Sequence, residues 1–212
     1  MSSSLHRSFA ELGFWIKRAA TGAGLSHGEG EELAGNAAFL AARGFDPSGL
    51  VARVLDKYTV VVESGKNLPS GWIRNIAEAD EVVCQLMGGG YAEFETDSKS
   101  ETLLQLAQVA RCLIENDSGD ISISINNGPG QNFGAAFAIL EESSGDDESP
   151  TLPIVLRLKI SEPMDPQGSA MTGVDVDADA WAVIDGYFRQ SLVPSSDASR
   201  TGGAGAGLTD ND

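Results

Sequence analysis

Three arginines are candidates for chemistry because basic side chains are scarce in this sequence. The 212 residues include 14 lysines and arginines against 31 aspartates and glutamates. Arg18, Arg43 and Arg200 each lie among small residues, where little bulk would cover a guanidinium. An arginine in such a setting can hold a carboxylate through paired hydrogen bonds, and that carboxylate belongs either to the chain itself or to a small ligand. We therefore treat these arginines as ligand-binding candidates.

The C-terminal stretch 199–212, SRTGGAGAGLTDND, is the second candidate region. Glycines at alternate positions allow a chain to run close beside another backbone, so we expect this stretch to pack against the N-terminal helices or against a partner. Arg200 would anchor it. The stretch adds Ser199, Asp210, Asn211 and Asp212 to the ligand-binding candidates.

His27 is a candidate acid or base, because the carboxylates of Glu29 and Glu31 lie close to it in sequence and favour a proton on the imidazole. It is also simply the first residue after a helix cap. The sequence contains no Ser-His-Asp order and no His-x-x-x-His pair. We expect no metal site, and the sequence leaves the cofactor undetermined.

Two stretches resemble known binding loops but fail in detail. Residues 126–134, NNGPGQNFG, follow an expected strand, as a phosphate-binding loop would. However, Pro129 lacks an amide hydrogen, and a second expected strand after the loop provides no helix dipole. Residues 175–179, DVDAD, resemble the start of a calcium loop, but Ala180 and Gly186 stand where Gly and Glu are needed. We interpret the first stretch as a turn and the second as helix capping.

The charge balance excludes some partners. The formal net charge is -17, so the average field repels nucleic acid and anionic membrane surfaces. Cys84 and Cys112 show no C-x-x-C spacing, which indicates buried thiols in a reducing compartment. The N-terminus lacks an apolar signal region, and no apolar run approaches about 18 residues. We expect a cytoplasmic protein that binds neither nucleic acid nor membrane.

The first part of the chain is predicted to be helical. Apolar residues three or four apart indicate helices at 5–21 and 27–43, and the second begins at a capping box formed by Ser26 and Glu29. Many alanines on the second helix predict a tight helical hairpin. A third helix follows Asp46, a suitable cap. Residues 1–64 thus form a helical region.

The rest of the chain, 65–212, is predicted to mix helices with an antiparallel sheet. The expected elements are a connection at 64–90 with a short helix at 78–87, a helix that begins after a Ser98-Glu101 cap, strands at 121–125, 135–141 and 152–160, and a helix at 178–191 capped by Asp177. The connections between strands are too short for helical crossovers, so we expect an antiparallel meander. The fold class is α+β, with both regions in one compact unit.

Several segments resemble a family of small, mostly proteobacterial proteins of unknown function. The resemblance is carried by AATGAGL at 19–25, EELAG at 31–35, LAARG at 40–44, VP at 193–194, ASR at 198–200 and GAGAGLTDND at 203–212. One departure is His27, where members of the family tend to have an aromatic residue such as tryptophan. The resemblance implies neither a reaction nor a cofactor.

Two classes of function follow as hypotheses. The first is a non-catalytic accessory or oligomeric subunit in small-molecule catabolism, with a homo-oligomer or a protein partner. The second is an enzyme or sensor for a small carboxylate or amide metabolite, in which an arginine grips the carboxylate and Asp210 or Asp212 acts as a base or holds a cation. A metal-assisted hydrolase is a variant of the second hypothesis. Whether the protein is an enzyme stays open at this point.

Overall fold

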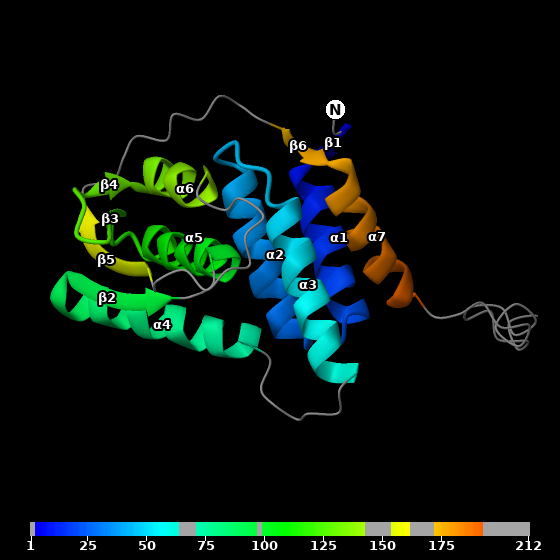
Figure 1. Ribbon diagram of the computed structural model, residues 1–212, viewed down its shortest axis with the longest axis horizontal. Helices are drawn as coiled ribbons and strands as arrows, with labels where there is room; N and C mark the ends of the chain where they lie inside the picture. The colour runs from blue at the N-terminus through cyan, green and yellow to red at the C-terminus, as the bar shows by residue number, and fades with distance from the viewer. Residues whose placement is uncertain (1–2, 64–70, 97–98, 143–153, 162–171, 193–212) are drawn as a thin grey trace, which may run out of the picture.

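The computed structural model describes residues 3–63, 71–96, 99–142, 154–161 and 172–192, and shows an α+β fold (Figure 1). The helices are α1 (Phe9–Gly22), α2 (His27–Ala41), α3 (Ser48–Glu63), α4 (Gly71–Gly89), α5 (Lys99–Glu115), α6 (Phe133–Glu142) and α7 (Ala178–Gln190). The strands are β1 (Ser4–Ser8), β2 (Tyr91–Thr96), β3 (Asp120–Ile125), β4 (Gln131–Asn132), β5 (Ile154–Ser161) and β6 (Gly173–Asp177). The predicted fold class is confirmed.

The helical half of the molecule is built from α1, α2, α3 and α7 (Figure 1). The predicted hairpin is present, since α1 packs against α2, and α7 lies on the other side of α1. Local signals start these helices as expected. Ser26 and Glu29 form the predicted capping box of α2, and Asp46 accepts a hydrogen bond from the Ser48 N–H at 2.8 Å where α3 begins.

The first helix starts later than predicted. Residues Ser4–Ser8 form β1, which pairs antiparallel with β6. The prediction of a helix from residue 5 was wrong because a capping box formed by Ser8 and Glu11 begins α1 at Phe9. Leu5 fits the helical spacing by coincidence, and its strand pairs with a segment far away in the sequence, which periodicity does not reveal.

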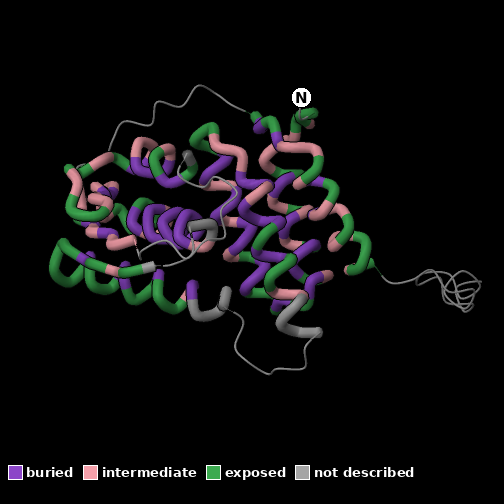
Figure 2. Tube along the Cα trace, viewed as in Figure 1, coloured by how far each residue is buried: buried purple, intermediate pink, exposed green. Residues whose placement is uncertain are grey.

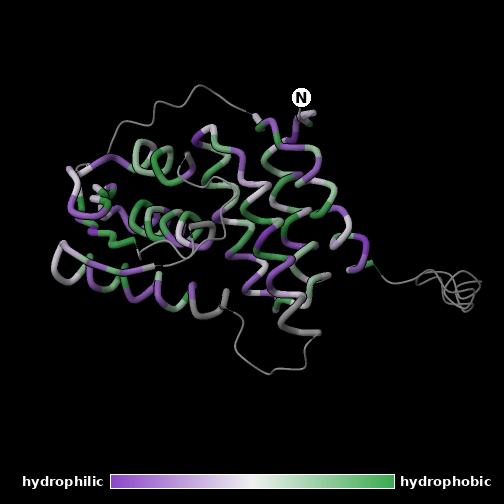
Figure 3. Tube along the Cα trace, viewed as in Figure 1, coloured by the Kyte–Doolittle hydropathy of each residue, from purple (hydrophilic) through white to green (hydrophobic). Residues whose placement is uncertain are grey.

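The main sheet has the strand order β2-β5-β3-β4, and its paired neighbours are antiparallel. The predicted alternation is confirmed in β3 and β5, where Ile121, Ile123, Leu156 and Leu158 are buried. These side chains pack on α4, α5 and α6, and α5 is the most buried of these helices, whereas α6 is the most apolar (Figures 2 and 3). The opposite side of the sheet faces solvent.

The predicted strand at 135–141 is wrong, because these residues lie in α6. The sheet is therefore not a simple three-stranded meander. Phe133, Ala136, Phe137 and Leu140 are buried at helical spacing, three or four residues apart. A short apolar run fits a strand and a buried helix equally well by pattern alone, and here the sheet beneath it favours the helix.

The connection predicted at 64–90 is mostly the long helix α4, and the edge strand β2 that follows it was not predicted. Cys84 on α4 is exposed, contrary to the expectation of a buried thiol, whereas Cys112 on α5 is half-buried and burial raises its pKa. The capping role predicted for Asp177 is confirmed, since its carboxylate accepts bonds from the N–H groups of Asp179 at 3.0 Å and Ala180 at 2.9 Å.

Candidate functional site

The solvent-facing side of the main sheet carries two rows of polar side chains. In one row Lys159 of β5 lies opposite Tyr91 of β2 and opposite Ser122 of β3. In the next row Arg157 lies opposite Glu93 of β2 and Ser124 of β3. Because the side-chain period of a strand is two, burial of the isoleucines and leucines on one side forces these polar residues onto the other side.

The loop 126–130 closes one end of these rows. Asn126 and Asn127 both have positive φ, at 48° and 64°, and the Gly128 N–H donates to the Ile125 carbonyl at 2.8 Å. Such a turn requires residues that tolerate the left-handed region, and asparagine is among the few that do. The Asn126 carboxamide oxygen accepts a hydrogen bond from the Val155 N–H at 3.0 Å, which ties the loop to β5.

The two rows and the loop surround a depression of about 350 Å³. Its lining consists of Tyr91, Ser122, Ser124, Asn127, Gly128, Gly130, Arg157 and Lys159. Gly130 passes so close to Ser122 that a Cβ there would lie 2.6 Å from the Ser122 Oγ. The turn predicted at 126–134 is confirmed for residues 126–130 only, because 131–132 form β4 and α6 begins at Phe133, in place of the predicted strand.

The Arg157 guanidinium is held in place at the edge of the depression. Its Nε donates to the Glu93 carboxylate and its Nη1 to the Asn127 side-chain oxygen. The same Glu93 oxygen accepts a hydrogen bond from the Tyr91 hydroxyl at 2.8 Å. The bond from Arg157 lowers the pKa of Glu93, and the bond to Glu93 raises the pKa of Tyr91. Glu93 therefore stays ionised and Tyr91 stays neutral at physiological pH.

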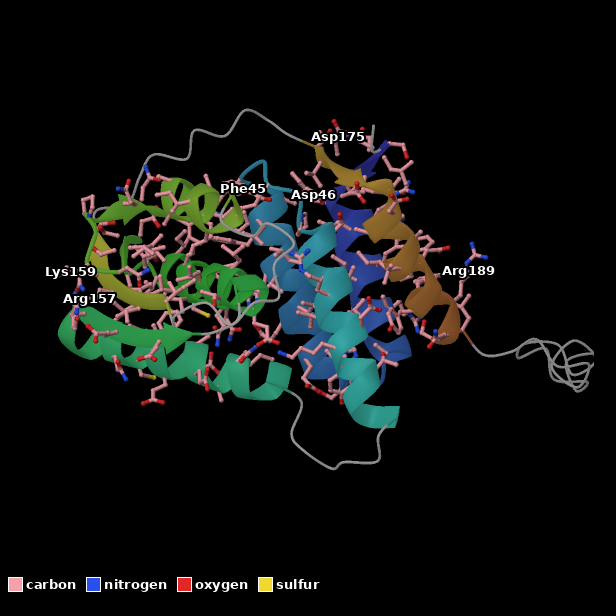
Figure 4. The ribbon with its side chains drawn as sticks, in the orientation of Figure 1. Phe45, Asp46, Arg157, Lys159, Asp175 and Arg189 are labelled. Carbon is pink, nitrogen blue, oxygen red and sulfur yellow. The ribbon has the colours of Figure 1, made fainter. Side chains whose placement is uncertain are left out.

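Several donors remain available to a ligand. The Lys159 ammonium makes no hydrogen bond with any residue that the structure describes. Within the same described part of the chain, the hydroxyls of Ser122 and Ser124 also lack a partner. Figure 4 shows Arg157 and Lys159 together on the outer side of β5, away from the helical half. Donors of this kind bind the oxygens of a carboxylate or phosphate group.

The lining is unsuited to a metal ion, because lysine and arginine carry positive charge and the remaining residues are serine, asparagine, tyrosine and glycine. Elsewhere in the ranges that the structure describes, no group of three or more His, Cys, Asp or Glu side chains could hold a metal.

The described helices also include none long and apolar enough to cross a bilayer.

The arginines chosen from the sequence lie elsewhere. Arg18 is exposed on α1, with its guanidinium carbon 5.9 Å from the centre of the Phe14 ring. Arg43 follows α2, where it lies 3.4 Å from the centre of the Phe39 ring and donates to the Phe39 carbonyl at 3.3 Å. Arg43 also lies 5.9 Å from the centre of the Phe133 ring. Burial lowers the pKa of Arg43, and the nearby charge of Asp120 opposes that effect. Neither arginine lines the depression.

His27 lies at the start of α2 and is exposed, with its Nε2 3.3 Å from Glu31. Glu31 also pairs with Lys17 at 2.6 Å, and this ion pair is the main cause of the lowered pKa of Glu31. His27 does not line the depression either. The remaining candidates, Ser199, Arg200, Asp210, Asn211 and Asp212, lie outside the described residues.

Sequence reasoning missed Arg157 and Lys159 as site residues, because each appeared only as the polar half of an alternating strand. The signal that could have found them is the combination of two serines on one strand and two cations on another, both facing the same side. That combination becomes visible only when β3 and β5 are paired in the observed register.

Comparison with known proteins gives one result. Residues 7–69 match the model of a family described as "Protein of unknown function (DUF3726)", which confirms the resemblance to a family of unknown function. The match covers α1, α2 and α3 and ends before the strands that form the depression. No curated protein and no solved structure matches the chain.

Proposed function

We propose that this chain, in which residues 7–69 match a protein family of unknown function, is a non-catalytic protein that binds a small carboxylate or a related anion on the open side of its main sheet. The observation that carries the proposal is the unpaired Lys159 ammonium beside the fixed Arg157 guanidinium in one depression. Two serine hydroxyls opposite these cations add neutral donors.

Binding fits the lining better than acid–base catalysis does. The chain has two histidines, His6 on β1 and His27 on α2, and neither lines the depression. The nearby carboxylate, Glu93, already accepts bonds from Arg157 and Tyr91. A serine needs an adjacent base to become a nucleophile, and the lining contains neither a histidine nor a carboxylate beside Ser122 or Ser124. The groups present can hold an anion, but they are not arranged to transform it.

The location of the depression also favours recognition of an anion. The whole chain carries a formal net charge of -17, so an anion is repelled by most of the surface. Two cations at neighbouring rows of a concave surface create a local exception, and the attraction between charges strengthens where water is partly excluded. An anion is therefore attracted to the depression and repelled by most of the remaining surface.

We expect the protein to act as an accessory subunit in small-molecule catabolism. The homo-oligomer or protein partner predicted from the sequence stays a prediction. Native mass spectrometry of the full chain measures the oligomeric state directly, with and without benzoate as a simple carboxylate probe. A monomer that binds benzoate would support the ligand-binding part of the proposal and would remove the oligomeric part.

Calorimetric titration tests the ligand-binding part. We would titrate the full chain with acetate, benzoate, phenyl phosphate and the neutral benzamide. The informative variant is Lys159→Gln, and its matched control is Arg18→Gln, which removes the same charge from an exposed site on α1. We expect at least one anion to bind and to lose about tenfold in affinity in Lys159→Gln, because a charge-assisted hydrogen bond is lost, while Arg18→Gln binds normally.

Two results would refute the proposal. The first is that no anion binds to the natural chain. The second is that binding survives Lys159→Gln unchanged or weakens equally in Arg18→Gln, since the attraction would then come from general charge and not from the depression.

A further inference from the structure

We infer that the ligand is an aromatic monocarboxylate, with its carboxylate held by Lys159 and Arg157 and its ring packed on Tyr91. The inference rests on the proposed function and names the class of ligand for the same site. It is drawn from three features of the depression: an aromatic side chain fixed at its edge, a local charge of one positive unit, and a small volume.

Tyr91 is a large aromatic side chain left open to solvent beside the cations. It is 42% exposed and lines the depression. Its hydroxyl donates to Glu93 at 2.8 Å, which limits the rotation of the ring before any ligand arrives. A ring that is already fixed loses little conformational entropy when another ring packs on it. Tyr91 thus provides a preorganised surface for a planar group.

The position of Tyr91 favours a ligand whose ring and charge lie close together. Tyr91 lies directly opposite Lys159 in the antiparallel ladder. Side chains at directly opposed positions have Cβ atoms about 4.5 to 5.5 Å apart. A ligand that reaches both residues therefore carries its anionic group close to its ring, as in benzoate and other aryl acids. A long chain between the ring and the carboxylate would move the two apart.

The charge around the depression matches a single negative charge. Arg157 and Lys159 each contribute a positive unit, and Glu93, bonded to Arg157, contributes a negative unit. One positive unit remains, which a monocarboxylate balances. A phosphate monoester with close to two negative charges would exceed it and would meet repulsion from Glu93. The neutral Tyr91 adds no charge, because the bond to Glu93 raises its pKa.

The volume supports a ligand with one ring. Ligand pockets commonly measure about 300 to 1,000 Å³, and this depression of about 350 Å³ lies at the lower end of that range. A single aromatic ring with a carboxylate fits such a space. A dinucleotide or a similar extended cofactor would extend well beyond the lining residues.

The test compares three probes of similar size: benzoate, cyclohexanecarboxylate and phenyl phosphate. We expect the natural chain to bind benzoate about threefold to tenfold more tightly than cyclohexanecarboxylate, since aromatic pairs add attraction beyond area burial. Phenyl phosphate should bind less tightly than benzoate. Tyr91→Leu should abolish the preference for the aromatic ring, and Tyr91→Phe should retain it. The matched control is Phe14→Leu, which removes an aromatic ring that is 54% exposed on α1 and should leave the preference intact.

The outcomes separate the inference from the proposed function. Equal binding of the two monocarboxylates, tighter binding of phenyl phosphate, or a ring preference that survives Tyr91→Leu would overturn the inference. If binding in those cases still depended on Lys159, the proposed function would stand. If no probe bound, both would be refuted.

Discussion

Lys159 lies directly opposite Ser122 in the antiparallel pairing of β5 with β3, on the side of the sheet that faces solvent. This pairing places a cation next to a hydroxyl at the point where the loop 126–130 passes over the sheet. The two residues are far apart in sequence, and the observed register is what makes them neighbours. The anion-binding site depends on this register, and so do the effects expected from substitution of Glu93 and Gly130.

Glu93→Gln should shift selectivity from monoanions toward dianions. The change raises the local charge from one positive unit to two and releases Arg157 from its ion pair. We expect the affinity ratio of phenyl phosphate to benzoate to rise about threefold or more, in keeping with the modest strength of exposed charge interactions. Calorimetric titration of both probes measures it.

The control for this prediction is Glu95→Gln, one row farther along the same side of β2 and opposite Val155. It removes the same charge at a greater distance from the cations, so its effect should be smaller. An unchanged ratio in Glu93→Gln would contradict the charge argument.

Gly130→Ala should weaken anion binding without unfolding the protein. The added Cβ would lie 2.6 Å from the Ser122 Oγ and would displace that hydroxyl from the depression. Because a serine side chain can rotate, we expect a small change in Tm and a loss of affinity of about threefold to tenfold for benzoate, the usual effect of one lost hydrogen bond. Gly134→Ala is the control, since its nearest neighbour would be 3.7 Å away. Normal affinity in Gly130→Ala would argue against a role for Ser122.

Two glycines of α1 should respond in opposite directions to alanine. A Cβ at Gly22 would lie 1.8 Å from the Tyr187 carbonyl oxygen of α7, so Gly22→Ala should lower the free energy of unfolding by about 1 to 3 kcal/mol. A Cβ at Gly13 would meet nothing within 4 Å, so Gly13→Ala should raise that free energy by about 0.5 to 1 kcal/mol through its better helix propensity. Urea unfolding of both variants checks the packing of α1 on α7, and a tolerated Gly22→Ala would contradict it.

The start of α1 should be sensitive to pH through Glu11. The bond from the Ser8 backbone N–H is the main cause that lowers the pKa of Glu11, and the bond from the Ser8 hydroxyl adds to it. A carboxylate with a lowered pKa in the folded state stabilises the fold above its unfolded pKa of about 4.3, and this contribution is lost as the pH falls through the folded pKa. Glu11→Gln should therefore be less stable than the natural chain at neutral pH.

The stability difference between the natural chain and Glu11→Gln should shrink as the pH falls below about 4. Urea unfolding of both proteins at several pH values measures that difference. A difference that does not vary with pH would show that the ionised carboxylate is not what caps the helix.

The elements that the sequence predicted correctly depend on signals within a few residues. The capping pair Ser26 and Glu29 lies three positions apart, and Asp177 accepts from the two amides that begin α7. The alternation in β3 and β5 likewise needs only the neighbouring residues on each strand. Local rules were sufficient here because the physical causes are local.

The features that the sequence did not reveal depend on pairing between distant segments. β1 was assigned to a helix because its partner, β6, lies near the other end of the described chain. The apolar run of α6 was assigned to a strand because its pattern fits both structures. Arg157 and Lys159 became site residues only once β5 was paired with β2 and β3. Candidate residues such as Arg18 were chosen because small residues flank them in the sequence. The flanking residues do not indicate which side chains lie nearby in the folded protein.

The most direct test of anion binding at the depression is a titration of the full chain with benzoate, followed in the amide NMR spectrum. The account predicts that the shifted signals cluster at Ser122, Ser124, Gly128 and Gly130, and that these shifts need about ten times more benzoate in Lys159→Gln but not in Arg18→Gln. Shifts that cluster around Arg18 or Arg43 or within residues 199–212, or the absence of any shift, would contradict the account.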